Sequence, residues 1–224
     1  MSTAAPSRAP QAAYEVPADE YYATLARWRG YSYRERRRLL LPRLGGRVLD
    51  VGCGDGRIVL AALADRGVGL DASGAMLAAA RARAPLARLT RADAQALPFR
   101  GASFETVLAS HALWLFGDAQ AFVAEARRVL VPGGRLVIVS NHPHYFWARS
   151  CVLGISAAMG RHHVEPPPLL HRRRDIEAAL RRAGFLAARS ESFLVLPVPG
   201  FAWLDRTPLR RLGLSFVIEA RAPA

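Results

Sequence analysis

Short apolar runs alternate with helical segments along residues 47–140, and this alternation constrains the fold more than any other feature of the chain. Most of the runs are rich in Val and Leu, which is typical of strands buried on both faces. The predicted strands are 47–51, 68–71, 87–91, 104–110 and 135–140, the last after a Pro-Gly-Gly turn, and the helices are 57–65, 74–84 and 118–130. Alternation of this kind builds a parallel sheet with right-handed crossovers.

The flanks of this region are less regular. The predicted parts are a flexible N-terminus over residues 1–13, a helical cap over 14–44 whose second helix stops at Pro42, a lid insert over 141–171, a helix over 175–182 and a closing strand pair over 185–196 and 212–220. With 224 residues, we expect one domain over 14–224. The expected fold is α/β: a Rossmann-like doubly wound sheet, mostly parallel with an antiparallel C-terminal strand, with helices on both faces.

Three aspartates mark one edge of the predicted sheet. Asp50, Asp71 and Asp93 end successive strands, about twenty residues apart, so their carboxylates meet at the ligand-binding edge. Residues 52–56, Gly-Cys-Gly-Asp-Gly, let backbone approach a ligand closely, but Arg57 stands where a dinucleotide site has its third glycine. The acids repel a ribose phosphate, so the pattern predicts an adenosine without phosphates, with a cationic or zwitterionic tail near Asp50.

The chain resembles a known family at these positions, the class I S-adenosylmethionine-dependent methyltransferases, and more closely their type 11 methyltransferase domains. The resemblance covers about residues 48–138 and rests on five segments in family order: VLDVGCGDG (48–56), GLD (69–71), RADAQALPF (91–99), FETV (104–107) and EARRVLVPGG (125–134). Glu105 and Val131 depart from the family's more frequent Asp and Lys.

The resemblance implies S-adenosyl-L-methionine as the cofactor. It places the methionine part over 50–54, ribose on Asp71, adenine against Asp93 and Ala94, and the reacting sulfonium near Ser110 and His111. The residues expected to bind the cofactor are Asp50, Gly52, Cys53, Gly54, Gly56, Asp71, Ala72, Met76, Asp93, Ala94 and Ser110. Each aspartate also has a purely structural interpretation, as a loop or helix cap.

Methyl transfer from a sulfonium is an in-line displacement, so the protein must align the reactants and exclude water. A base is needed only where a hydroxyl, phenol or ammonium acceptor must lose a proton, and histidine is suited to that at neutral pH. The candidate catalytic residues are His111, His142, His144 and Tyr145. An equal alternative is that these histidines merely line the lid. No metal site is predicted, because the gap between His144 and the His162-His163 pair is long.

Charge and aromatic content bear on partners. The formal charge is +13, but all 31 basic residues are arginine and their clusters are scattered, so we interpret them as solvated faces and do not expect nucleic acid. Aromatic residues of the cap and insert favour a small hydrophobic or aromatic acceptor, and an amphipathic lid would also suit a membrane or lipid-like acceptor. With no signal-peptide pattern and two cysteines, we expect a cytoplasmic monomer or homodimer.

The predicted function is therefore methyl transfer from S-adenosylmethionine to a small metabolite, with O- or N-methylation ahead of C-methylation. Two alternatives remain open at this point. One is methylation of RNA or protein, and the other is a non-catalytic subunit that binds the cofactor.

Overall fold

A computed structural model describes residues 33–34, 36–142, 172–186, 188–193, 207, 213 and 215–224. The predictions for the flexible N-terminus, for most of the helical cap and for the lid insert after His142 lie outside these residues. The described residues of 33–40 are helical and lead into η2 (Leu41–Arg43), which holds Pro42 in its first turn.

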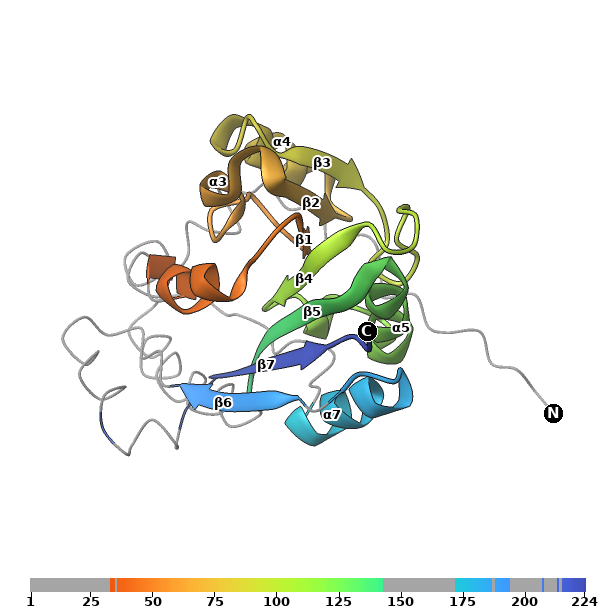
Figure 1. Ribbon diagram of the computed structural model, residues 1–224. Coiled ribbons are helices and arrows are strands. Elements are labelled where there is room, and N and C mark those ends of the chain that lie inside the picture. The colour runs from red at the N-terminus through yellow and green to blue at the C-terminus, as the bar shows by residue number, and fades with distance from the viewer. Residues whose placement is uncertain are drawn as a thin grey trace.

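Within the described residues, seven strands form one sheet in the order β3-β2-β1-β4-β5-β7-β6 (Figure 1). Their bounds are β1 Val48–Val51, β2 Gly67–Asp71, β3 Arg88–Arg91, β4 Phe104–Ser110, β5 Leu130–Asn141, β6 Arg189–Phe193 and β7 Ser215–Arg221. The order reverses between β1 and β4, and in open α/β sheets ligands bind at such a reversal, beyond the carboxyl ends of the strands.

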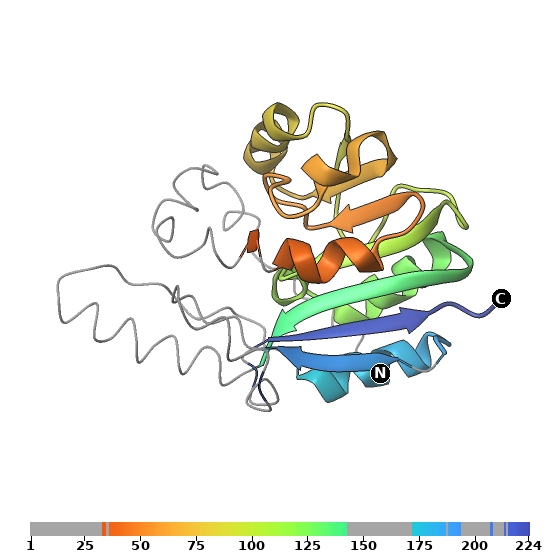
Figure 2. The same ribbon diagram turned by 60° about the vertical axis from the view of Figure 1, so that its left-hand side comes forward.

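Strand direction confirms the predicted sheet. β3, β2, β1, β4 and β5 pair in parallel, whereas β7 is antiparallel to both β5 and β6. Figure 2 shows the arrow of β7 running against those of its two neighbours. Parallel pairing places the carboxyl ends of β1, β2 and β4 at one edge, so the residues that follow these strands are brought together.

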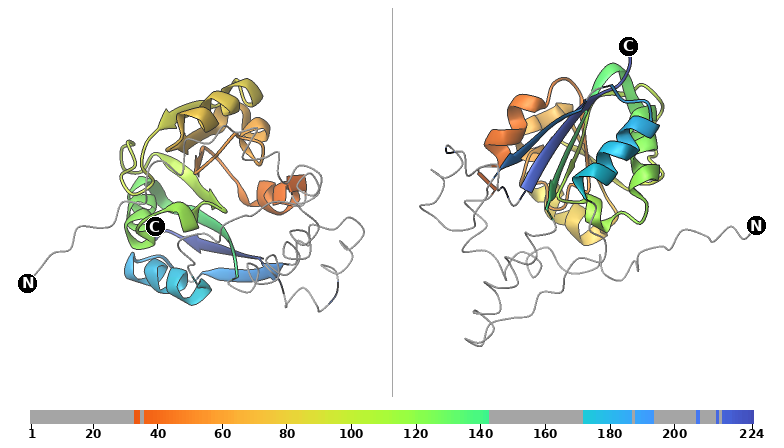
Figure 3. Two further views of the ribbon diagram at one scale, coloured as in Figure 1. Left: turned by 180° about the vertical axis from the view of Figure 1, so that it is seen from behind. Right: turned by 90° about the horizontal axis from the view of Figure 1, so that it is seen from below.

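Helices cover both faces of the sheet, as Figure 3 shows when the sheet is seen from below. One face packs against α5 (Ala119–Val129) and α7 (Arg173–Arg182), through residues such as Phe122 and Leu180. The other packs against Leu40 of the N-terminal helical segment and against α3 (Leu60–Leu63). The remaining α-helix with bounds in the described residues is α4 (Gly74–Arg83). Strand residues alternate between the two faces, as buried parallel strands must.

Three predicted boundaries are wrong: the helix over 57–65, the strand start at 135, and the strand start at 185, since that strand begins as β6 only at Arg189. The helix expected over 57–65 is reduced to α3 and the 3-10 turn η3 (Ala64–Arg66). The carboxylate of Asp55 accepts the N–H of Arg57 (3.2 Å), which favours a turn over a helix there, and Ala64 has a left-handed φ of 52°.

β5 begins at Leu130 instead of residue 135, because it passes through the Pro-Gly-Gly segment. The register against β4 shifts between Phe104 and Thr106 to admit the extra residues. The backbone of this segment is held by the chain's last residues: the N–H of Gly133 donates to the carbonyl of Pro223, and the N–H of Ala222 to the carbonyl of Gly134.

Among the described residues, no helix is long and apolar enough to cross a membrane.

Candidate functional site

The glycine loop, residues 52–56, leaves β1 at the reversal of the sheet and is tied to β2. The N–H groups of Gly52 and Cys53 both donate to the carbonyl of Leu70, at 2.7 and 3.0 Å. Gly52, Gly54 and Gly56 all have φ between 55° and 72°. A residue with a Cβ adopts this conformation at a cost, so the sequence of the loop is fixed by its backbone.

Gly52 also lies against the chain beyond β4. A Cβ at position 52 would be 2.3 Å from the Cβ of Ala112, far inside van der Waals contact. The side chain of Cys53 points the other way, toward β2. Its Sγ lies so close to Gly69 that a Cβ added there would be 2.9 Å from it. The thiol is therefore packed away, and the pKa of Cys53 is raised well above its usual value, first by burial and then by the charges of Asp50 and Asp71.

Asp71 joins the glycine loop to the start of α4. Its Oδ2 accepts the N–H of Gly54 (2.8 Å) and its Oδ1 accepts the N–H of Ser73 (2.9 Å). Burial raises the pKa of Asp71, and the backbone hydrogen bonds from Ser73, Gly54 and Ala72 partly offset that rise. Each carboxylate oxygen can accept further hydrogen bonds, so this side chain can also bind two neighbouring hydroxyls of a ligand.

Asp50 is the most deeply buried of the predicted acids, with 3% of its surface exposed. It lies in the centre of the sheet, paired with Gly69 of β2 and Leu108 of β4. Burial first, and the charge of Asp71 second, raise the pKa of Asp50 to about 7. A buried carboxylate beside a second one favours a cationic ligand group, as the sequence pattern predicted.

Sequence reasoning missed the role of Asp55 within the glycine loop. This carboxylate is only 1% exposed and lies between two arginines, Arg57 and Arg83 of α4. Arg57 Nε lies 2.9 and 2.7 Å from the two oxygens of Asp55, and Arg83 also donates to its backbone carbonyl at 3.1 Å. The guanidinium of Arg57 lies 5.2 Å from the ring centroid of Tyr33. The cluster therefore fixes the loop to α4 and to the N-terminal segment.

Sequence reasoning also missed Ser73, although a serine before an apolar helix is a recognised N-cap signal. Its Oγ accepts the N–H of Met76 at 3.2 Å and so begins α4. Of the two predicted cofactor residues beside Ser73, Met76 is buried and Ala72 is exposed.

The end of β4 contributes Ser110 and His111, as predicted. Ser110 is buried, and its Oγ has no hydrogen-bond partner within the described part of the chain. His111 is half-buried with φ 54°, and its backbone N–H donates to the carbonyl of Val139 on β5 (2.8 Å). A left-handed histidine is costly, and such backbone strain clusters at functional sites.

Asp93 and Ala94 follow β3, at the side of the site. Asp93 is exposed, and its Oδ1 accepts the backbone N–H of Gln95 (2.9 Å) and its side-chain amide (3.1 Å). Asp93 therefore has the capping role that the sequence allowed as an alternative. These two hydrogen bonds use only part of the acceptor capacity of the carboxylate. Ala94 beside it is buried.

His142 comes directly after β5, whereas His144 and Tyr145 lie outside the described residues. The ring nitrogen Nε2 of His142 lies 3.2 Å from Ser192 Oγ on β6, and the ring centroid lies 4.8 Å from that of Phe216. Beneath this pair, Ser215 Oγ donates to Asn141 Oδ1 at 2.7 Å in a buried position. The carboxyl end of β5 therefore carries a polar group of side chains next to the segment predicted as a lid.

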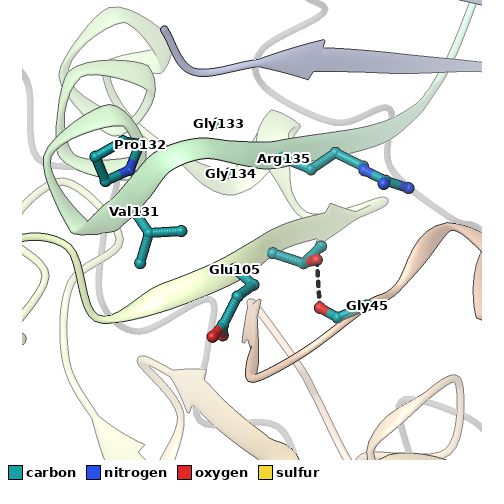
Figure 4. A pocket seen from close by; sticks show the side chains of 8 residues that line it. Gly45, Glu105, Val131, Pro132, Gly133, Gly134 and Arg135 are labelled. Carbon is teal, nitrogen blue, oxygen red and sulfur yellow. Dashed lines mark hydrogen bonds between the residues drawn. The ribbon is translucent and has the colours of Figure 1, made fainter. Parts of the chain in front are cut away.

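A different pocket, of about 270 Å³, opens at the opposite edge of the sheet, between the starts of β4 and β5. Figure 4 shows the Glu105 and Arg135 side chains pointing in different directions. Thr106 Oγ1 donates to the carbonyl of Gly45 at 2.8 Å. Glu105 accepts the N–H of Arg47, and Arg135 donates to the carbonyl of Arg43. Because these polar groups are already bound within the protein, we do not assign the functional site to this pocket.

No cluster of three or more His, Cys, Asp or Glu side chains suited to a metal ion occurs among the described residues.

A family model described as a methyltransferase domain matches residues 49–138. An uncharacterised methyltransferase of Synechocystis is 33% identical over 153 residues, which are 66% of this chain and 71% of that protein. The demethylmenaquinone methyltransferase of Thermus thermophilus is 37% identical over 126 residues, 51% of this chain and 57% of that relative. The chain thus spans little more than half the length of the Thermus protein.

Among solved structures, an S-adenosylmethionine dependent methyltransferase from Mesorhizobium loti superimposes with a TM-score of 0.58 at 26% identity, covering 83% of this chain and 95% of that one. The segment matched by the family model contains the glycine loop and the acids Asp50 and Asp71. The strand order, the site at its reversal and these relatives agree: the chain belongs to the class I S-adenosylmethionine-dependent methyltransferases.

Proposed function

We propose that this protein transfers the methyl group of S-adenosylmethionine to a small hydrophobic or aromatic acceptor. The observation that carries the proposal is the position of Asp71, whose two oxygens hold the N–H groups of Gly54 and Ser73 at the carboxyl ends of β1 and β2. This arrangement closes the glycine loop against an acid that repels phosphate and can accept ribose hydroxyls. It fits an adenosine that has no phosphate.

The residues present fit this cofactor in four further respects. Asp50 is a buried acid placed for the cationic methionine end, and the glycine loop lets a ligand approach the backbone closely without side chains in the way. Ser110 offers a buried hydroxyl at the end of β4. Asp93 and Ala94 are placed beyond β3 for the adenine. The bound cofactor supplies an activated methyl group on a sulfonium.

The chain's own task is to orient the acceptor, keep water out and take up a proton where the acceptor has one to lose. His111 and His142 follow β4 and β5 at the same edge and are the described candidates for that proton. We assign the acceptor pocket to this edge. The name of the Thermus relative, which refers to demethylmenaquinone, supports a small-molecule acceptor.

Binding of the cofactor product S-adenosylhomocysteine tests the site directly. We expect Asp71→Ala to weaken binding by about 10- to 100-fold, because charge-assisted hydrogen bonds contribute about 1.5–3 kcal/mol, and Asp93→Ala to weaken it as well. Asp175→Ala, an exposed acid on α7, is the matched control and should bind as the wild type does. Unchanged affinity in both site variants would overturn the assignment.

The acceptor class is tested by incubating the protein with labelled S-adenosylmethionine and a cell extract. Label is then measured in solvent-soluble, nucleic-acid and protein fractions. We expect label in the solvent-soluble fraction. Label in a nuclease- or protease-sensitive fraction would contradict a small-molecule acceptor.

A further inference from the structure

Asp50 differs from two other acids of the site, Asp71 and Asp55, in what surrounds its carboxylate. Asp71 accepts two backbone N–H groups, and Asp55 is bound by two arginines. Within the described residues no hydrogen bond to the Asp50 carboxylate is seen, and only 3% of this residue is exposed, in β1 between β2 and β4. Burial of this kind makes the ionised form of a carboxyl group costly.

None of the described groups that face Asp50 is a cation that could stabilise its ionised form. β2 contributes the second carboxylate, Asp71, and the glycine loop contributes the buried thiol of Cys53. The charge of Asp55 is matched by its two arginines. On the other side, the paired β4 residue is the apolar Leu108, and His111 is the first titratable residue after that strand. Burial and Asp71 together raise the pKa of Asp50 to about 7.

We propose that Asp50 holds a proton in the ligand-free protein and releases it to solvent when the cationic ammonium of the cofactor's methionine end binds beside it. The proposal rests on the proposed function, because it assumes that this cofactor binds at this edge. One O–H bond of the carboxyl group breaks, the proton goes to the buffer, and the carboxylate then faces the ammonium. Cofactor affinity therefore increases with pH until Asp50 is ionised in the free protein.

Calorimetry with S-adenosylhomocysteine measures this proton, since the compound carries the same ammonium and is not turned over. The binding enthalpy at pH 7 is measured in several buffers with different ionisation enthalpies, and its slope gives the number of protons released. We expect about half a proton per bound ligand for the wild type, because a group titrating near pH 7 is half protonated there. We also expect affinity to rise about tenfold between pH 6 and pH 8.

Two variants identify the group that releases the proton. Asp50→Asn keeps the shape of the side chain and should release none, whereas His111→Gln should release as much as the wild type. If the histidine variant loses the signal, or if Asp50→Asn retains it, the assignment to Asp50 is wrong. If Asp50→Asn binds too weakly to measure, a wild-type affinity that stays constant from pH 6 to pH 8 would overturn the proposal.

The outcomes also separate this inference from the proposed function. Tight binding of S-adenosylhomocysteine without proton release leaves the methyltransferase site intact and refutes only the role of Asp50. Absence of binding at every pH refutes the proposed function itself.

Discussion

The contact between Gly52 and Ala112 provides a quantitative test of the site's architecture. Gly52 has φ 71°, and a Cβ there would lie 2.3 Å from the Cβ of Ala112. A left-handed conformation costs a residue with a Cβ about 1–2 kcal/mol, and overpacking costs about 1–3 kcal/mol. We therefore expect Gly52→Ala to lower the free energy of unfolding by about 3 kcal/mol, counting both effects.

The two contributions separate in an Ala112→Gly background. With the Ala112 Cβ gone, the nearest remaining atoms are Ala112 Cα and Phe116 Cε1, both at an ordinary 3.7 Å. Gly52→Ala should then cost only the backbone contribution of about 1–2 kcal/mol. Gly133 is a matched control, since it has φ 70° and no atom within 4 Å of an added Cβ, so Gly133→Ala should show the backbone contribution alone.

Urea unfolding of the wild type, the two single variants and the double variant, followed by circular dichroism, gives the coupling between positions 52 and 112. Gly133→Ala is measured beside them. If Gly52→Ala costs the same in both backgrounds, within about 0.5 kcal/mol, the two loops do not touch as described. The slope of free energy against urea must stay constant across the variants for the comparison to hold.

Three further predictions concern the ligand-free protein. Because the pKa of Asp50 is about 7 when folded against an ordinary 3.8, the folded state holds this proton more tightly, so Asp50 lowers stability progressively as pH rises from about 4 to about 7. Asp50→Asn should therefore gain about 3 kcal/mol on the wild type between pH 5 and pH 8 in urea unfolding, and a pH-independent difference would contradict this. Asp55→Asn removes the charge between Arg57 and Arg83 and should cost about 3 kcal/mol in the same assay, whereas a loss below about 1 kcal/mol would show that the cluster is not bound as described. Leu108→Ala, in a fully buried position of β4, should lower the free energy of unfolding by about 2–5 kcal/mol, and a loss within about 0.5 kcal/mol would contradict its burial.

The sheet was predictable because its evidence is local. Apolar runs between helical segments identify β1, β2 and β4, and parallel pairing then brings Asp50 and Asp71 to one edge whatever the surrounding packing. The glycines at positions 52, 54 and 56 also indicate the loop in the sequence, because glycine adopts left-handed backbone readily. The cofactor half of the site could therefore be proposed before its geometry was known.

The remaining features depend on contacts that no local pattern encodes. Arg83 binds Asp55 from 28 residues away in the sequence. His142 contacts Ser192 across 50 residues, and this second contact depends on the position of β6 beside β7. The start of β5 was missed because Pro and Gly usually end strands, whereas here the backbone hydrogen bonds of Gly133 and Gly134 to Pro223 and Ala222 keep the segment in the sheet. Tertiary contacts overrode local preference at each of these places.

The insertion of β7 between β5 and β6 has a consequence for the order in which the molecule assembles. Among the described strands β6 bonds only to β7, which follows it in sequence, so β6 has no strand partner until β7 is in place. Closing β7 onto β5 joins Arg135 to Arg221, a pairing of high contact order with a large loop-closure entropy. The strands β1–β5 that carry Asp50 and Asp71 pair over shorter sequence separations, the longest being that of β1 with β4, as in Val48 with Thr106. We expect the cofactor edge to form first on a growing chain, with the β6–β7 pair added last.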